Sequence, residues 1–75
     1  MAYTDEQAKK DIFAAMDSLS IVEKIKDIDK DKRTEDEKNE LFRNERHIKI
    51  KMGFRKFVEN LTHAQNKKIK DLNLD

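Results

Sequence analysis

The feature that most constrains the fold of this chain is its lack of helix breakers: it has no proline and a single glycine, Gly53. Proline removes a backbone donor and disrupts a helix, and glycine is the next most unfavourable residue in a helix interior. Almost nothing along the 75 residues therefore opposes helix formation. The sequence predicts an all-α fold, in one domain that covers residues 1–75.

Hydroxyl residues mark where the helices are expected to begin. The chain has five serine and threonine residues, and four of them are followed three positions later by Glu or Gln. In this capping-box spacing, the hydroxyl accepts from the backbone amide three residues on, and the side chain there reaches back. The four predicted caps are Thr4, Ser20, Thr34 and Thr62. They predict helices at 5–18, 21–31, 35–52 and 63–72, with a further helical segment at 54–61.

The apolar pattern also indicates breaks near Ser20 and Gly53. At about 100° per residue, six apolar residues share one face, namely Ala8, Ile12, Ala15, Met16, Leu19 and Val22. Three further residues, Ile21, Ile25 and Ile28, lie nearly opposite to it. A second reversal falls at Gly53, where left-handed dihedral angles are accessible. Two architectures remain open. One is a small bundle of four to five short helices, broken at both positions, and the other is a helical hairpin that self-associates.

Apolar residues are scarce for a chain of this length. They make up 36% of the sequence and charged residues 44%, against about 45–50% and about 25% in ordinary globular domains. With so little surface to bury, the hydrophobic gain barely exceeds the entropy lost on folding. We therefore expect the chain to bind a partner, to self-associate, or to do both.

No group of residues matches a known catalytic or metal-binding pattern. There is no cysteine, and no glycine-rich loop that could hold phosphate. The Asp-x-Asp-x-Asp motif at 27–31 resembles the start of a calcium-binding EF-hand loop. However, Lys32 and Lys38 stand where that loop needs glycine and a bidentate glutamate. The two histidines, His47 and His63, lack neighbouring ligands at helical spacing. We predict no enzyme activity, no metal and no cofactor.

The location is predicted from what the sequence lacks. No stretch approaches the roughly 18 uncharged apolar residues that a membrane-spanning helix requires. The first residues lack the basic and apolar regions of a signal peptide, and the lack of cysteine fits a reducing compartment. We expect a soluble cytoplasmic protein without membrane contact.

The two parts of the chain carry opposite net charge. Residues 1–40 contain 12 acidic and 8 basic groups, whereas residues 41–75 contain 9 basic and 4 acidic groups. These parts can attract each other within one molecule or across a dimer, or the basic part can bind a nucleic acid. The candidates for a nucleic-acid surface are Arg43, Arg46, Lys49, Lys51, Arg55 and Lys56. On one continuous helix they would point in nearly every direction, which favours internal or protein–protein complementarity.

Apolar residues interleaved with these cations are the candidates for binding a protein partner. They are Leu41, Phe42, Ile48, Ile50, Met52, Phe54 and Phe57. Three functions remain open. The first is a small non-enzymatic regulatory or adaptor protein that binds another protein. The second is a nucleic-acid-binding accessory protein that uses residues 43–56, and the third is a structural homo-oligomer.

The last third of the chain carries one family resemblance. Residues 54–62 are Phe-Arg-Lys-Phe-Val-Glu-Asn-Leu-Thr, followed by Lys67, Lys68 and Asp71. This stretch of 18 residues resembles the T-even phage anti-sigma proteins, which are small, all-helical, cytoplasmic proteins that bind a host sigma subunit and redirect RNA polymerase. Residues 1–53 show no comparable match. The resemblance implies a modulator of host transcription, and it transfers no functional residues to this chain.

Overall fold

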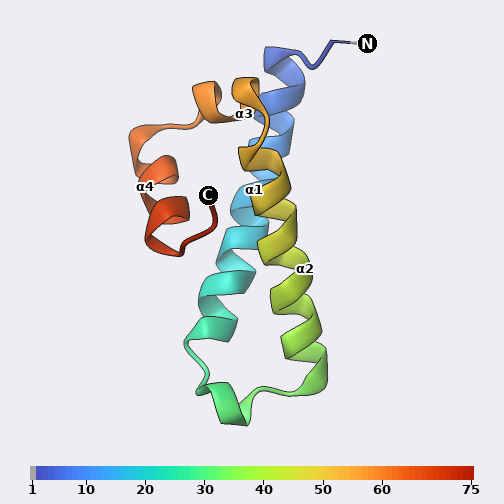
Figure 1. Ribbon diagram of the computed structural model, residues 1–75, viewed down its shortest axis with the longest axis vertical. Helices are drawn as coiled ribbons and strands as arrows, with labels where there is room; N and C mark the ends of the chain where they lie inside the picture. The colour runs from blue at the N-terminus through green and yellow to red at the C-terminus, as the bar shows by residue number, and fades with distance from the viewer. Residues whose placement is uncertain (1) are drawn as a thin grey trace.

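Residues 2–75 are described by a computed structural model, and their regular structure is helical (Figure 1). The helices are α1 (Asp5–Lys26), the short 3-10 helix η1 (Lys30–Lys32), α2 (Glu35–Met52), α3 (Arg55–Asn60) and α4 (His63–Asp71). No strand occurs within residues 2–75. The all-α prediction is confirmed.

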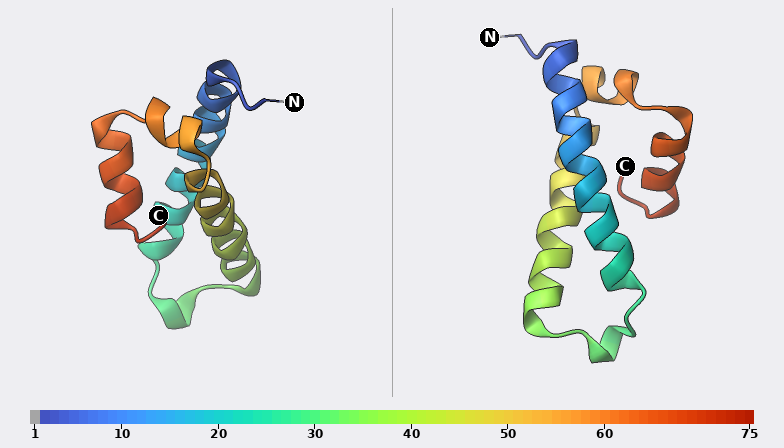
Figure 2. Two further views of the ribbon diagram at one scale, coloured as in Figure 1. Left: turned by 45° about the horizontal axis from the view of Figure 1, so that its top comes forward. Right: turned by 180° about the vertical axis from the view of Figure 1, so that it is seen from behind.

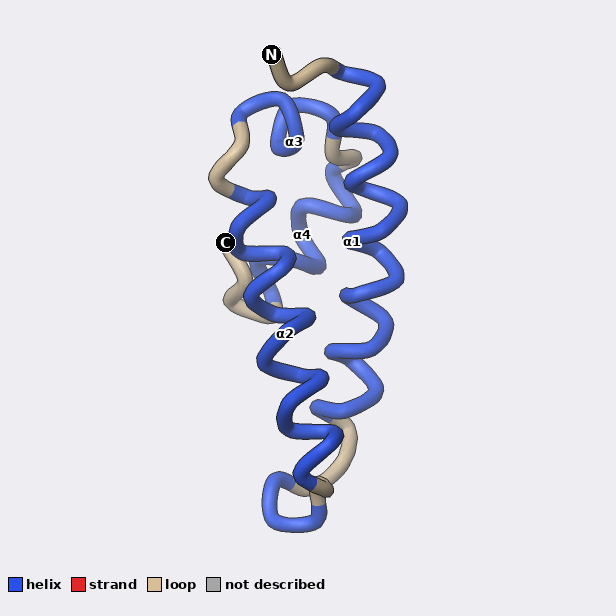
Figure 3. The backbone as a smooth tube through the Cα atoms, turned by 90° about the vertical axis from the view of Figure 1, so that its right-hand side faces the viewer, coloured by secondary structure: helices blue, strands red, loops and turns tan. Residues whose placement is uncertain are grey.

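Helices α1 and α2 lie side by side as an antiparallel hairpin, joined by the turn that contains η1 (Figures 1 and 3). Helices α3 and α4 fold back along one side of this hairpin (Figure 2), and α3 contacts both α1 and α2. The molecule measures 42 × 25 × 16 Å along its principal axes. The chain is therefore a small all-α bundle, built on a long hairpin that the two short C-terminal helices complete.

Helix α1 runs through Ser20 without a break, so the predicted cap there and the predicted helix end at residue 18 are wrong. The buried residues of α1 repeat at intervals of three and four. They are Ala8, Ile12, Ala15, Leu19, Val22 and Ile25. This single stripe allows one straight helix to bury one face along its whole length. Of the three residues that suggested a second face, Ile25 belongs to this stripe and is buried, whereas Ile21 and Ile28 are only half-buried.

The other three predicted caps are present. Thr4 accepts from the backbone amide three residues on, and Thr34 and Thr62 each form a complete capping box. The predicted break at Gly53 is also present, since α2 ends one residue before it. Gly53 itself has a φ of −78°, so α2 ends there without the left-handed dihedral angles that glycine was predicted to supply.

A Schellman motif ends α4 and turns the end of the chain back into the protein. Asn73 has a φ of 58°, and its amide donates to the carbonyl of Lys70 at 3.0 Å. The amide of Leu74 donates to the carbonyl of Ile69, also at 3.0 Å. Asparagine tolerates the left-handed region better than most residues, which explains its place here. The motif directs the Leu74 side chain inward, where it is fully buried.

Each of the four α-helices contributes to one hydrophobic core, together with the end of the chain. The buried residues that form it are Ile12, Ala15, Leu19, Val22, Ile48, Phe57, Ile69 and Leu74. Ile48 is the only buried residue of α2, Phe57 that of α3 and Ile69 that of α4. Because α2 buries so little, most of its surface remains available for other contacts.

Candidate functional site

The seven apolar candidates for protein binding separate into an interior group and an exposed group. The interior group is Leu41, Ile48, Met52 and Phe57, which lie in the core or pack against it. The exposed group is Phe42, Ile50 and Phe54, with 63%, 52% and 42% of their surface exposed. Ile48 and Phe57 are fully buried, and Leu41 and Met52 are partly buried. The exposed group is therefore the better candidate for a binding surface.

Phe54 is partly covered by contacts within the protein. Its ring lies 5.2 Å from the ring of Tyr3, measured between centroids. The ammonium group of Lys51 lies 5.5 Å from the centroid of the same ring, a cation–π distance. Phe54 therefore helps to hold the N-terminal residues in place, and Phe42 and Ile50 remain as the exposed apolar candidates without such contacts.

Lys51 is held by α1. Its ammonium group donates to the carboxylate of Asp11 at 3.1 Å, and the hydroxyl of Tyr3 donates to the same oxygen. The hydrogen bond from Tyr3 is the largest cause that lowers the pKa of Asp11, and Lys51 adds to it. Burial, followed by the hydrogen bond to Asp11, raises the pKa of Tyr3 to about 12. These three groups form a polar cluster that joins the N-terminal residues, α1 and the end of α2.

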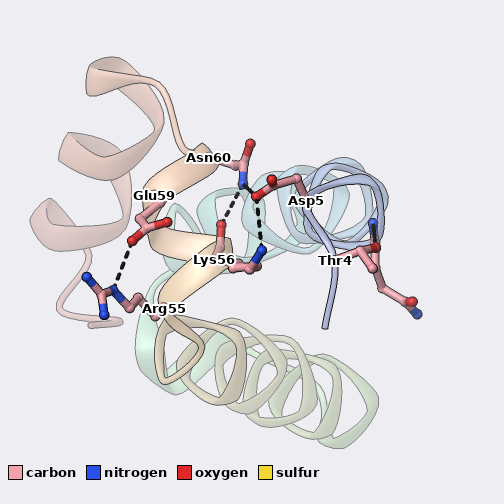
Figure 4. A network of polar contacts seen from close by, with 7 residues as sticks. Thr4, Asp5, Arg55, Lys56, Glu59 and Asn60 are labelled. Carbon is pink, nitrogen blue, oxygen red and sulfur yellow. Dashed lines mark hydrogen bonds and ion pairs between the residues drawn. The ribbon is translucent and has the colours of Figure 1, made fainter. Parts of the chain in front are cut away.

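The two basic residues of α3 are also paired, as Figure 4 shows. Arg55 donates to Glu59 at 2.9 Å, one helical turn away. Lys56 lies 4.0 Å from the carboxylate of Asp5 at the start of α1, and Asn60 donates to the same carboxylate at 3.1 Å. The contacts with Asp5 attach α3 to α1. Together with Lys51, three of the six basic candidates therefore have acidic partners inside the molecule.

The opposite charges of the two parts of the chain thus attract each other within one molecule. Besides the pairs made by Lys51 and Lys56, Lys68 of α4 lies 3.7 Å from Glu23 of α1. A further pair runs the other way, from Lys26 to Glu45, at 3.4 Å. All four pairs connect α1 to a later helix. The opposite charges of the two parts therefore help to hold the helices of one molecule together.

The remaining candidates gather on one face of α2. Phe42, Arg43, Arg46, Lys49 and Ile50 are all exposed, and at 3.6 residues per turn they fall within roughly 120° on the side opposite Ile48. We call these five residues the outer face of α2. Within residues 2–75, none of its three cations forms an ion pair. Part of this face, with Glu45, lines a shallow depression of about 160 Å³.

A second surface lies between α1 and the junction of α3 with α4. Phe13 is 77% exposed there, the largest fraction among the big apolar side chains of residues 2–75. Beside it is an apolar groove of about 460 Å³. The groove is lined by Lys9, Ile12, Phe13, Met16, Asn60, Thr62 and Gln65. The sequence reasoning did not select Phe13, although its position outside the stripe of buried α1 residues is a signal that could have found it.

Within residues 2–75, no three His, Cys, Asp or Glu side chains are placed to hold a metal ion together. In the loop that resembled an EF-hand, Asp29 pairs with Lys32 at 3.8 Å. His47 and His63 lie on different helices, α2 and α4. None of the helices in residues 2–75 has the length and apolar character needed to cross a membrane.

Comparisons with known proteins do not assign the chain to a family. It matches no protein-family model, no curated protein and no solved structure. In residues 54–71, the structure has a short helix followed by a capped helix that begins at His63. The kinship of this stretch with the T-even phage anti-sigma proteins stays a prediction.

Proposed function

We propose that this chain is a small non-enzymatic regulatory or adaptor protein that binds another protein through the outer face of α2. The observation that carries the proposal is the exposure of Phe42 and Ile50 next to three cations that have no ion pair within residues 2–75. Protein interfaces combine an apolar centre with a polar rim, and aromatic and arginine side chains are enriched in them. The outer face of α2 has this composition.

The spacing on this face indicates the shape of the partner. Phe42, Arg46 and Ile50 follow one another at intervals of four residues, which places the two apolar side chains about 12 Å apart along the helix. A second helix can contact both if it carries apolar residues two turns apart. Carboxylates beside them would face Arg43, Arg46 and Lys49. The partner that fits is a protein with an acidic amphipathic helix.

Nucleic-acid binding remains the second candidate, and the arrangement of charges favours it less. Of the six basic candidates, Lys51, Arg55 and Lys56 are engaged by acidic side chains of the same molecule. The three that remain share their face with one aromatic ring, which gives few places for bases to stack. The third candidate, a structural homo-oligomer, would use a different surface, the one beside Phe13.

The resemblance of residues 54–71 to anti-sigma proteins adds a partner class to this proposal, namely a protein of the host transcription machinery. We also propose a cytoplasmic location, which the lack of cysteine supports. Both statements rest on the sequence, and they can fail without affecting the assignment of the binding face.

Affinity capture with matched variants tests the proposal. The tagged protein is incubated with nuclease-treated lysate of the organism that encodes it, and retained proteins are identified by mass spectrometry. Phe42→Ala/Ile50→Ala and Arg43→Glu/Arg46→Glu/Lys49→Glu should each lose a protein that the wild type retains, whereas Phe13→Ala should keep it. Equal retention by all four proteins would contradict the proposal.

The nucleic-acid alternative is tested by fluorescence anisotropy with a labelled DNA duplex and a labelled single-stranded RNA over a salt series. Binding through the three cations would weaken steeply with salt and disappear in the triple variant. Such a result, together with no retained protein, would replace the proposed function by the alternative.

A further inference from the structure

The exposed side of α1 has a regular order of charge around its most exposed ring. Lys9 precedes Phe13 by four residues and Asp17 follows it by four, and all three are exposed. Residues four apart lie on the same row of a helix, about 6 Å from one another along its axis. Within residues 2–75, neither Lys9 nor Asp17 forms an ion pair. The row therefore consists of a cation, an exposed ring and an anion, and neither charge is paired within residues 2–75.

The groove next to this row can accept an apolar side chain from outside. Ile12 and Met16 supply one wall from α1, and residues of the α3–α4 junction supply the other. Its volume of about 460 Å³ falls in the range of sites that hold small molecules, and thus exceeds what a single phenyl ring requires. Phe13 stands at the edge of this groove. A ring and a groove that could receive it lie side by side on the same surface.

We propose that the occupant of this groove is Phe13 of a second copy of the chain, in an antiparallel dimer whose two-fold axis passes beside Phe13. A two-fold interface is formed by the same patch on both copies, so it requires a patch that complements itself. The ring and the groove meet this requirement, because each copy would offer its ring to the other copy's groove.

The order of charges fixes the direction of the pairing. Lys9 and Asp17 are equally distant from Phe13 along α1, so the axis places Lys9 opposite Asp17 of the partner subunit, and this contact occurs twice. A parallel pairing would instead bring like charges together at both positions. Rows of residues four apart are also the ridges that pack between helices in the commonest crossing geometry. The order of charges thus favours the antiparallel dimer, and the packing of such rows is compatible with it.

The dimer would leave the outer face of α2 accessible. The groove is lined by residues of α1 and of the α3–α4 junction, and none of α2. The outer face of α2 lies on the side of that helix opposite the buried Ile48. Self-association therefore does not depend on the proposed function, and either can be present without the other.

Sedimentation equilibrium of the purified full chain over a range of micromolar concentrations tests the dimer. The wild type should fit a monomer–dimer equilibrium. Phe13→Ala should raise the dissociation constant at least about 30-fold, because the dimer loses two central aromatic side chains. Phe42→Ala is the matched control and should leave the constant unchanged. A wild type that is monomeric throughout, a Phe13→Ala variant with the wild-type constant, or a dimer broken by Phe42→Ala would overturn the proposal.

A charge exchange tests the direction. Asp17→Lys replaces two attractive contacts by two repulsive ones and should raise the dissociation constant about tenfold. Adding Lys9→Asp to that variant recreates the attraction with its sign reversed, so the double variant should return to within about threefold of the wild type. Failure of the double variant to recover, or no effect of Asp17→Lys, would overturn the antiparallel arrangement. Circular dichroism of each variant confirms that the helices are retained.

Discussion

Lys51, near the end of α2, donates to Asp11 of α1 at 3.1 Å and so connects two residues that are 40 positions apart in the sequence. The contact holds the ends of the two long helices together, and it removes one cation from the set that a nucleic acid could contact. Tyr3 completes the cluster from the N-terminal side. The shifted pKa values of Tyr3 and Asp11 in this cluster give two predictions that do not depend on any binding partner.

Tyr3 is the only tyrosine, and the chain has no tryptophan, so its ionisation can be followed by the absorbance of tyrosinate. Since burial and Asp11 raise its pKa to about 12, the absorbance of the folded protein should change near pH 12, and that of the unfolded protein near pH 10. The unfolded chain then loses the proton first. The free energy of unfolding should therefore fall as the pH rises from about 10 to about 12. A folded-state midpoint near pH 10 would contradict the cluster.

Asp11 should make the opposite contribution at low pH. Its pKa in the folded protein is lowered from 3.8, so its carboxylate stabilises the fold above that pH, and the contribution is lost as the pH falls through the lowered value. Asp11→Asn should cost about 1–2 kcal/mol at pH 7, measured by urea unfolding. The difference from the wild type should shrink below about pH 3.8. If Asp11→Asn destabilises the protein as much below about pH 3.8 as at pH 7, the charge of Asp11 does not contribute to stability.

The hydroxyl residues give a prediction that separates caps from interior positions. Thr34→Ala and Thr62→Ala should each lower the free energy of unfolding by about 1 kcal/mol, because each removes a capping box. Ser20→Ala is the matched control, since it places alanine, the best helix former, at an exposed position inside α1. It should raise stability by up to about 0.5 kcal/mol. A loss at Ser20 similar to that at Thr62 would contradict the continuity of α1.

Asn73 and Leu74 should contribute strongly to the stability of the fold, although they stand next to the end of the chain. Leu74→Ala empties a fully buried position and should cost about 2–4 kcal/mol in thermal or urea unfolding. Asn73→Gly should be neutral or stabilising because glycine adopts the left-handed region at no steric cost, whereas Asn73→Val should destabilise. Equal stability of the glycine and valine variants would contradict the Schellman motif.

Local signals in the sequence predicted most of the helix boundaries. The caps at Thr4, Thr34 and Thr62 and the break at Gly53 each depend on a few neighbouring residues, and all four are present. The prediction failed at Ser20 because a capping-box spacing can also occur inside a helix. Of the apolar residues that seemed to support a break there, Ile25 lies on the buried stripe of α1, and Ile21 and Ile28 are only half-buried.

The proposed binding face could not be selected from the sequence, because it depends on which side of α2 packs against α1. Ile48 and Ile50 are two residues apart and equally apolar, yet Ile48 is fully buried and Ile50 is 52% exposed. The pairing of Lys51 and Lys56 was equally hidden, since Asp11 and Asp5 lie far earlier in the chain. Such distinctions arise from tertiary packing, which residue spacing alone does not specify.

Site-specific photo-cross-linking in the native host tests the central claim most directly. A photoreactive phenylalanine analogue replaces Phe42 in one protein and Phe13 in another, and the adducts are identified by mass spectrometry. We predict that position 42 cross-links to an acidic protein and that Arg43→Glu/Arg46→Glu/Lys49→Glu abolishes this adduct, whereas position 13 cross-links to a second copy of the chain. No adduct at position 42, or an adduct there to nucleic acid or to this same chain, would contradict the assignment of the outer face of α2 as a protein-binding surface.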